Sequence, residues 1–252
     1  MPAVAATDLH RGGSSVIDLD LAPVQTKPFE HVLKEAYIDP ELYTQIVQSF
    51  PTCPPSTGPT GYSTYWGDEP YDRLMAENPA WKSLFNAFHS QEFIDYSIRQ
   101  FADAYRSYGC TIDLSKARYV PYQESKQDKE ARHISKVEHE PHELWVRLDI
   151  HQGLLGYKRK SHLDHRRRLI SMLVYLCDAD RNEMVGGDLV LHRAKSSPFG
   201  WGDLVVRPKH NRMAMFPCHR RSFHSVPEIT SEKGPRNFLQ ITVSSSVDAW
   251  SD

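Results

Sequence analysis

The sequence predicts a mainly β, α+β protein: a double-stranded β-helix (a jelly-roll or cupin-like barrel) buttressed by N-terminal helices. Two observations predict this class. Short apolar segments separated by turns that contain glycine or proline follow one another from about residue 144 to 246. Amphipathic segments with helical spacing precede them, in a helical preface at 28–110. Strands alternating with turns in this order are typical of two facing sheets with functional side chains at one open end.

The helical segments are assigned from their first residues and from the spacing of their apolar side chains. Asp39-Pro40 supplies an N-cap followed by proline at the first helical position, and Pro51 ends that helix. The segment 52–64 is rich in Pro, Gly, Ser and Thr, and is expected to be a loop. Asn78-Pro79 begins a second helix, and a third is expected at about 90–105.

The expected strands of the barrel are short and apolar. The segment 169–176 reads LISMLVYL and is expected to be a buried strand. Gly186-Gly187 is expected to form a turn into a strand at 189–191. Two further strands are expected at 213–216 and 238–243. Together these segments provide the strands that two facing sheets need.

Length, charge and cysteine content agree with one globular enzyme-sized unit. With 252 residues, 40% of them hydrophobic, the chain is expected to form a flexible tail at 1–27 and a single domain at 28–252. A net charge of −2 gives no general argument for nucleic acid or membrane binding, and no apolar segment has the length to span a bilayer. Cys53, Cys110, Cys177 and Cys218 are scattered and are expected to be reduced thiols. The protein is therefore predicted to be cytoplasmic, with its oligomeric state left open.

His162 and Asp164 form an H-x-D motif, and His224 follows later in the chain. Two imidazoles and one carboxylate on one face of a metal leave the opposite positions open, as in non-heme Fe(II) oxygenases. Residues i and i+2 of a strand point to the same side, so His162 and Asp164 can reach one ion together. Alone, the motif also fits a solvated surface strand. The order of strands and turns around it favours the metal site.

Six short motifs extend this pattern: His162-x-Asp164, Val174-Tyr175-Leu176, Gly186-Gly187-Asp188-Leu189, Met215-Phe216-Pro217, His224-Ser225-Val226 and Gly234-Pro235-Arg236. With them, the segment from about 144 to 246 resembles the 2-oxoglutarate- and Fe(II)-dependent dioxygenases, in the prolyl-hydroxylase-like branch. The resemblance implies an oxidoreductase that uses Fe(II), 2-oxoglutarate and O2, with ascorbate as an optional reductant, and releases succinate and CO2. It also implies that His162, Asp164 and His224 are the catalytic metal ligands.

The resemblance implies three residues that bind the cosubstrate 2-oxoglutarate. Arg236 would pair with its C5 carboxylate, because a planar guanidinium fits a carboxylate in a bidentate arrangement. Arg236 and Gln240 share one parity of their expected strand, which supports a cavity-facing arginine, although Phe238 breaks the alternation. Tyr175 would donate to the same carboxylate, with a purely structural core tyrosine as the alternative. Gln152 would lie near the metal-binding end of the cosubstrate.

Two polar segments have more than one interpretation. A basic cluster brackets the H-x-D motif: Lys158, Arg159, Lys160, Arg166, Arg167 and Arg168. It is either a solvated rim or an attraction for an anionic substrate, and both interpretations stay open. The segment 123–142 is highly polar, and a lid over the barrel mouth is one interpretation of it.

The predicted function is hydroxylation of a small-molecule, amino-acid or sugar-like substrate, with an anionic group as an open option. A peptidyl, prolyl-type hydroxylase that acts on a protein is the main alternative, because the resemblance carries no substrate information. A non-catalytic binding module and a hydrolytic metal-binding jelly roll are the others. Arg236 argues against both, since neither needs a carboxylate clamp beside a metal. Nucleic acid is not an expected partner.

Overall fold

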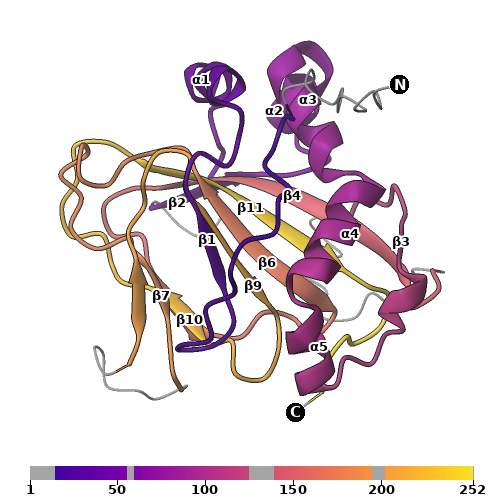
Figure 1. Ribbon diagram of the computed structural model, residues 1–252. Coiled ribbons are helices and arrows are strands. Elements are labelled where there is room, and N and C mark those ends of the chain that lie inside the picture. The colour runs from indigo at the N-terminus through magenta and orange to yellow at the C-terminus, as the bar shows by residue number, and fades with distance from the viewer. Residues whose placement is uncertain (1–14, 56–59, 125–138, 195–201, 252) are drawn as a thin grey trace, which may run out of the picture.

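The structure is a computed structural model that describes residues 15–55, 60–124, 139–194 and 202–251. Five α-helices and most of the strands of a β-helix make up this part of the chain (Figure 1). The elements, in chain order, are β1 Val32–Lys34, α1 Pro40–Gln48, β2 Gly61–Thr64, α2 Glu69–Glu77, α3 Pro79–Phe88, α4 Gln91–Gln100, α5 Ala102–Tyr108, η1 Leu114–Lys116, β3 Arg118–Tyr119, β4 Glu143–Gly153, β5 Arg159–His162, β6 Arg168–Tyr175, β7 Leu189–Leu191, β8 Leu204–Val206, β9 Met213–Pro217, β10 His224–Val226 and β11 Arg236–Ser244.

Two sheets build the barrel. The major sheet has seven strands, in the order β1-β9-β6-β11-β4-β2, with β3 added beside β4. The minor sheet has four short strands, in the order β5-β10-β7-β8. From β4 to β11, consecutive strands change sheet at every step except one, the hairpin of β7 and β8 within the minor sheet. This is the connectivity of a double-stranded β-helix. The expected fold is confirmed.

The outer face of the major sheet packs on the helices. Leu148 and Ile150 of β4 and Ile241 of β11 share the outward parity and are buried in one cluster with Trp81 of α3 and Phe93 of α4. The helices lie beside the sheet in Figure 1, on the side away from the minor sheet. This layer contains most of the buried aromatic side chains, so the predicted buttressing role of the helices is confirmed.

The inner face of the major sheet packs toward the minor sheet. Leu173, Phe216 and Phe238 from the major sheet form a second, smaller cluster with Leu189 and Val226 of the minor sheet. Polar residues occupy the other inward positions, as Gln240 and Ser171 do. The interior between the sheets is therefore partly apolar and partly polar, unlike the apolar layer beneath the helices.

Two local expectations differ from the structure. The predicted helix at 90–105 is two helices, α4 and α5, because the backbone leaves the helical range at Phe101 (ψ 26°). The predicted loop at 52–64 ends in the strand β2, which pairs with β4. The helix α2 and the strand β1 were not predicted from the sequence. Most of the polar segment 123–142 lies outside the described residues.

The predicted flexible tail, 1–27, is described from residue 15 onward. Ile17 is buried and pairs with Ile38, and the amide of Asp18 donates to the carbonyl oxygen of Tyr37 at 2.8 Å. The attached part of the chain thus begins before residue 28, because Ile17 fills a place in the core. The division into a tail and one domain at 28–252 otherwise stays a prediction.

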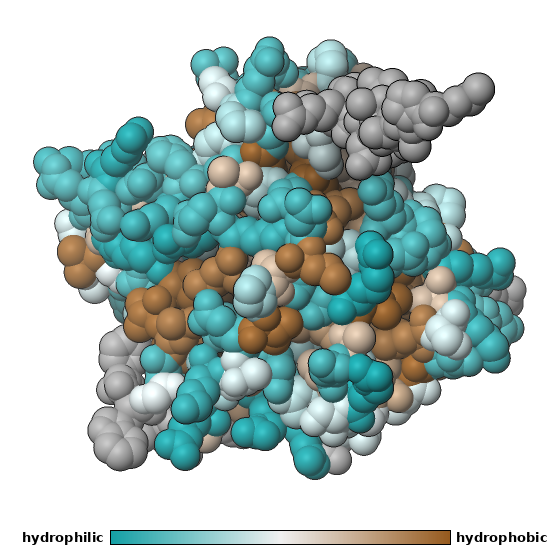
Figure 2. All heavy atoms as spheres, viewed as in Figure 1, coloured by the Kyte–Doolittle hydropathy of each residue, from teal (hydrophilic) through white to brown (hydrophobic). Residues whose placement is uncertain are grey.

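Hydrophilic side chains cover most of the face seen in Figure 2, with hydrophobic side chains between them near its centre. The larger exposed apolar side chains, such as Leu21 and Leu155, come from separate segments. Single exposed apolar residues are normal on a protein surface. None of the helices in the described ranges combines the length and the apolar character that a bilayer crossing requires.

Candidate metal centre

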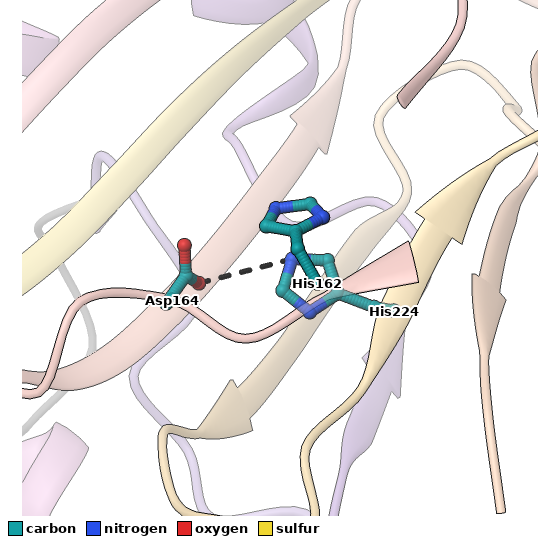
Figure 3. A group of neighbouring side chains, drawn as sticks. All are labelled: His162, Asp164 and His224. Atoms are coloured by element: carbon teal, nitrogen blue, oxygen red, sulfur yellow. Dashed lines mark ion pairs between the residues drawn. The ribbon is translucent and has the colours of Figure 1, made fainter. Parts of the chain in front are cut away.

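Three side chains with metal-binding atoms meet at the cavity side of the minor sheet (Figure 3). His162 is the last residue of β5, Asp164 lies two residues beyond it, and His224 is the first residue of β10. β5 and β10 pair so that His162 lies opposite His224. One potential ligand atom from each of the three side chains lies within 4.8 Å of the others. Asp164 reaches the group from outside the strand, whereas the sequence predicted a strand through the whole motif.

Both imidazole rings are held so that Nε2 faces the group. The Nδ1 atom of His162 lies 2.8 Å from the carbonyl oxygen of Lys160, and that of His224 lies 3.0 Å from the carbonyl oxygen of Ser222. A carbonyl oxygen only accepts, so each Nδ1 carries the proton and each Nε2 keeps a lone pair. Burial lowers the pKa of His224 to about 4, which keeps its ring neutral at neutral pH. Both rings are therefore prepared to donate to a metal.

Asp164 is buried and fixed by a cation. The Nη1 atom of Arg168 donates to its Oδ1 at 2.6 Å, and its Oδ2 lies 3.8 Å from Nε2 of His224. Burial would raise the pKa of this carboxyl group, but the Arg168 guanidinium and the two imidazoles hold it well below its usual range. Oδ2 therefore faces the two imidazoles as part of an ionised carboxylate. Two neutral nitrogen donors and one anionic oxygen fit a divalent metal such as Fe(II).

Arg236, at the start of β11, is fully buried. Its Nε donates to the carbonyl oxygen of Gly187 at 2.5 Å, while Nη1 and Nη2 have no hydrogen-bond partner within the described residues. A buried guanidinium with two unsatisfied nitrogen atoms is costly unless an anion completes it. These orphaned donors fit a carboxylate in a bidentate arrangement.

Aromatic rings enclose the Arg236 guanidinium. Its Cζ lies 4.2 Å from the ring centre of Phe238, 5.3 Å from that of Tyr175 and 5.7 Å from that of Tyr157. Phe238, which broke the expected alternation along β11, thus faces the cavity and packs on the guanidinium of Arg236. Such contacts stabilise a cation and exclude water from it.

A glycine turn places the carbonyl group that receives the Nε–H of Arg236. Gly186 and Gly187 have φ values of 82° and 75°, a region that favours glycine. A Cβ atom at Gly186 would lie 1.9 Å from the carbonyl oxygen of Glu228 in the segment before β11. The close approach of these two segments is therefore possible only with glycine at position 186.

One cavity of about 510 Å³ joins the metal-binding group to Arg236. Its walls come from both sheets, and His162, Asp164, His224 and Arg236 all line it. Volumes of roughly 300–1,000 Å³ are usual for pockets that bind small molecules. A metal ion and an anionic small molecule can thus occupy the same cavity.

Residues 148–241, which include all four of these side chains, match the family described as the 2OG-Fe(II) oxygenase superfamily. This match covers the barrel core and supports the superfamily that the sequence predicted. The protein is a 2-oxoglutarate-dependent oxidoreductase that uses Fe(II), 2-oxoglutarate and O2. No curated protein matches the sequence.

Solved structures of oxygenases resemble this one in fold. A 2OG-Fe(II) oxygenase family oxidoreductase from Burkholderia pseudomallei is 16% identical, with a TM-score of 0.50, and the match covers 87% of this chain and 86% of that one. A prolyl 4-hydroxylase from Phytophthora capsici is 16% identical, with a TM-score of 0.49 and coverage of 87% and 60%. A prolyl-4-hydroxylase from Pseudomonas putida is 10% identical, with a TM-score of 0.48 and coverage of 85% and 92%.

The other two predicted cosubstrate residues of this oxygenase lie in different places. Tyr175 faces inward beside Arg236, and its hydroxyl is buried without a hydrogen-bond partner. Burial raises its pKa to about 12, so the phenol keeps its proton and can donate. Gln152 does not reach the cavity: it bonds to Asn237 at 3.0 Å, on the face of the sheet opposite to Arg236. Its neighbour His151 has the inward parity and lines the cavity instead.

Sequence reasoning missed two residues that contact Asp164. Arg168 was counted in the basic cluster, yet its guanidinium is inside the oxygenase and pairs with Asp164. Cys218, the residue after β9, places its thiol 3.8 Å from Oδ2 of Asp164. The four-residue spacing of Arg168 from Asp164 was the available signal, but only the turn at 163–167 brings the two together.

Proposed function

We propose that His162, Asp164 and His224 hold Fe(II), and that Arg236 binds the C5 carboxylate of 2-oxoglutarate. The protein then hydroxylates a small-molecule, amino-acid or sugar-like substrate in the same cavity. The observation that carries this proposal is the buried Arg236 guanidinium, whose two unpartnered nitrogen atoms belong to the cavity that the three metal-binding side chains line.

The side chains of the chain have separate tasks in this proposal. The hydrogen bonds of His162 and His224 to backbone carbonyl oxygens keep their Nε2 atoms turned toward the metal. Arg168 occupies one oxygen of Asp164, so the carboxylate binds through the other. When bound, Fe(II) and 2-oxoglutarate supply the chemistry by which O2 converts a substrate C–H bond to C–OH, with release of succinate and CO2.

Arg236 and its aromatic neighbours set the cosubstrate's position. The fork of Nη1 and Nη2 fixes the direction of a carboxylate, and Tyr175 adds a donor from the neighbouring strand β6. Phe238 and Tyr157 keep water away from this ion pair, which strengthens it. A carboxylate held here at one end leaves the rest of the molecule free to extend toward the metal.

The cavity supports a small substrate over a peptide. It measures about 510 Å³, and it must hold the cosubstrate as well. A prolyl-type peptidyl hydroxylase is the alternative that a substrate screen distinguishes. The four cysteines are unpaired thiols, which supports the further proposal that the protein is cytoplasmic.

Anaerobic titration of the metal-free protein with Fe(II) and then 2-oxoglutarate tests the assignment. The expected result is a weak visible metal-to-ligand charge-transfer band that saturates with one equivalent of each. A substrate screen by succinate release then follows, with small acids, free amino acids and proline-containing peptides. Metal binding without a 2-oxoglutarate complex would overturn the proposal in favour of a hydrolytic or binding jelly roll.

A further inference from the structure

An irregularity in β5 turns an additional cation into the cavity. In the pairing with β10, His162 lies opposite His224 and Arg159 lies opposite Val226. Three steps along β5 thus correspond to two steps along β10, as in a β-bulge. In a regular strand, residues three apart face opposite sides. Because of the bulge, Arg159 and His162 both line the cavity.

Cationic side chains outnumber carboxylates on the cavity wall. The cationic side chains that line it are Arg159, Lys160, Arg168 and Arg236, whereas Asp164 is the only carboxylate among the described lining residues. Arg168 is paired with Asp164, and Arg236 pairs with 2-oxoglutarate in the proposed function. Fe(II) and the 2-oxoglutarate dianion together add no net charge, so the excess of positive charge on the cavity wall stays the same when both are bound. Arg159 and Lys160 make no ion pair with any described residue, so their charges stay uncompensated.

Arg159 is also held in place. Its Cζ lies 5.6 Å from the ring centre of Tyr157, the ring that Arg236 approaches at 5.7 Å. Both guanidinium groups thus approach the ring of the same tyrosine, so the second cation shares an aromatic neighbour with the proposed carboxylate site. Contact with an aromatic face restricts an arginine side chain and leaves its edge free for an anion.

We infer that Arg159, assisted by Lys160, forms a second anion subsite that binds a carboxylate or phosphate group of the substrate. This inference rests on the proposed function, because it assumes that 2-oxoglutarate occupies Arg236. The substrate is then a small anion, anchored three residues along β5 from the metal ligand His162. Anchoring at one charged group would hold one C–H bond near the metal.

Inorganic phosphate is the probe, and bound Mn(II) replaces Fe(II) as a paramagnetic reporter. The Mn(II) protein is first saturated with 2-oxoglutarate, and the binding of each is measured by calorimetry. Phosphate is then titrated, and its ³¹P line broadening reports binding near the metal. The variants are Arg159→Gln, Arg159→Lys and, as a matched control, Lys158→Gln. Lys158 is adjacent in sequence, but it is 57% exposed, pairs with Glu228 and does not line the cavity.

The expected result is that Arg159→Gln weakens phosphate binding about tenfold, because a charged hydrogen-bonding partner is lost. Arg159→Lys should recover part of this loss, and Lys158→Gln should stay within about twofold of the unchanged protein. Equal broadening in the unchanged protein and Arg159→Gln would overturn the subsite. An equal loss in Arg159→Gln and Lys158→Gln would also overturn it. Failure of 2-oxoglutarate to bind in the first step would instead overturn the proposed function.

Discussion

The two sheets of the barrel differ in construction. The strands at the centre of the major sheet have 8 to 11 residues, and a layer of helices covers their outer face. The strands of the minor sheet have only 3 or 4 residues, yet two of them carry His162 and His224. The difference indicates that stability comes mainly from one sheet, while the other presents ligands. It also raises the question of how such short strands are fixed.

Polar contacts compensate for the short strands. His192, which follows β7, lies 2.8 Å through Nδ1 from a carboxylate oxygen of Asp203 and 2.7 Å through Nε2 from the hydroxyl of Ser225. Ser225 is next to His224 in β10 and faces away from the cavity. This chain of hydrogen bonds ties β7, β8 and β10 together. The minor sheet thus depends on specific hydrogen bonds where the major sheet depends on apolar burial.

The largest expected effect is a loss of turnover, with little loss of stability, when a metal-binding residue of the minor sheet is replaced. His162→Ala should reduce Fe(II)-dependent 2-oxoglutarate turnover on the order of a thousandfold or more, since loss of a residue that merely supports a ligand already costs about 10–100-fold. The free energy of unfolding should change by less than about 1 kcal/mol, because His162 ends a strand and is exposed. Succinate release and thermal unfolding of the metal-free protein check both points. Retained turnover would show that the ligand set is different.

A substitution in the major sheet is expected to have the opposite effect: it should lower stability and leave 2-oxoglutarate binding unchanged. Ile241→Ala removes a fully buried side chain between β11 and the helices, and should lower the free energy of unfolding by roughly 2–5 kcal/mol. The folded fraction should keep its affinity for 2-oxoglutarate, because Ile241 has the outward parity. Urea unfolding and calorimetric titration at low temperature measure the two quantities. Loss of 2-oxoglutarate affinity together with stability would contradict the division of roles between the two sheets.

Arg236→Gln tests the one place where the major sheet contributes chemistry. The dissociation constant of 2-oxoglutarate should rise about a hundredfold, because a buried charged partner is lost, whereas Fe(II) affinity should change little. Titration with Fe(II) and then with 2-oxoglutarate measures the two affinities separately. Unchanged 2-oxoglutarate affinity would place the carboxylate site elsewhere. The variant Arg236→Lys should recover only part of the affinity, since an ammonium group does not reproduce the planar fork.

The smallest expected effect is on the pH dependence of stability, through a buried histidine of the helical layer. Burial lowers the pKa of His89, which stacks on Phe85 at 3.7 Å, to about 4. Its unfolded value is about 6.5, so on acidification the unfolded chain binds the proton first. The stability contribution is therefore complete above about pH 6.5 and is lost progressively as the pH falls toward 4. Unfolding of the metal-free protein between pH 7 and 4.5 should show a shallower decline in His89→Gln.

Much of the site could be predicted because its chemistry is local in sequence. The H-x-D spacing, the glycine pair and an arginine opening the last strand are short patterns. The structure brings His162, Asp164 and Arg236 to one cavity, and Gly187 accepts a hydrogen bond from Arg236. Gln152 could not be placed, since a one-residue change in parity moves a side chain to the other face of a sheet. His151 has the inward parity, and nothing in the sequence distinguishes the two.

The fold was predictable where patterns were long and strong. β6 and the helix α3 combine clear apolar spacing with recognisable ends. β1 and β2 were not found, because three or four residues give no measurable periodicity and depend on their partners in the sheet. Arg168 was misjudged for a similar reason: composition marks it as a surface cation, and only the turn that reverses the chain puts it inside.

The fit between Gly186 and the carbonyl oxygen of Glu228 has a consequence for sequence variation. Position 186 lies in a surface-connected turn and touches neither metal nor cosubstrate, so a survey of functional residues would pass over it. Yet any side chain there would push the segment before β11 outward and carry Arg236 with it. In a library of all single substitutions selected for activity, Gly186 should therefore be as intolerant of replacement as the metal ligands.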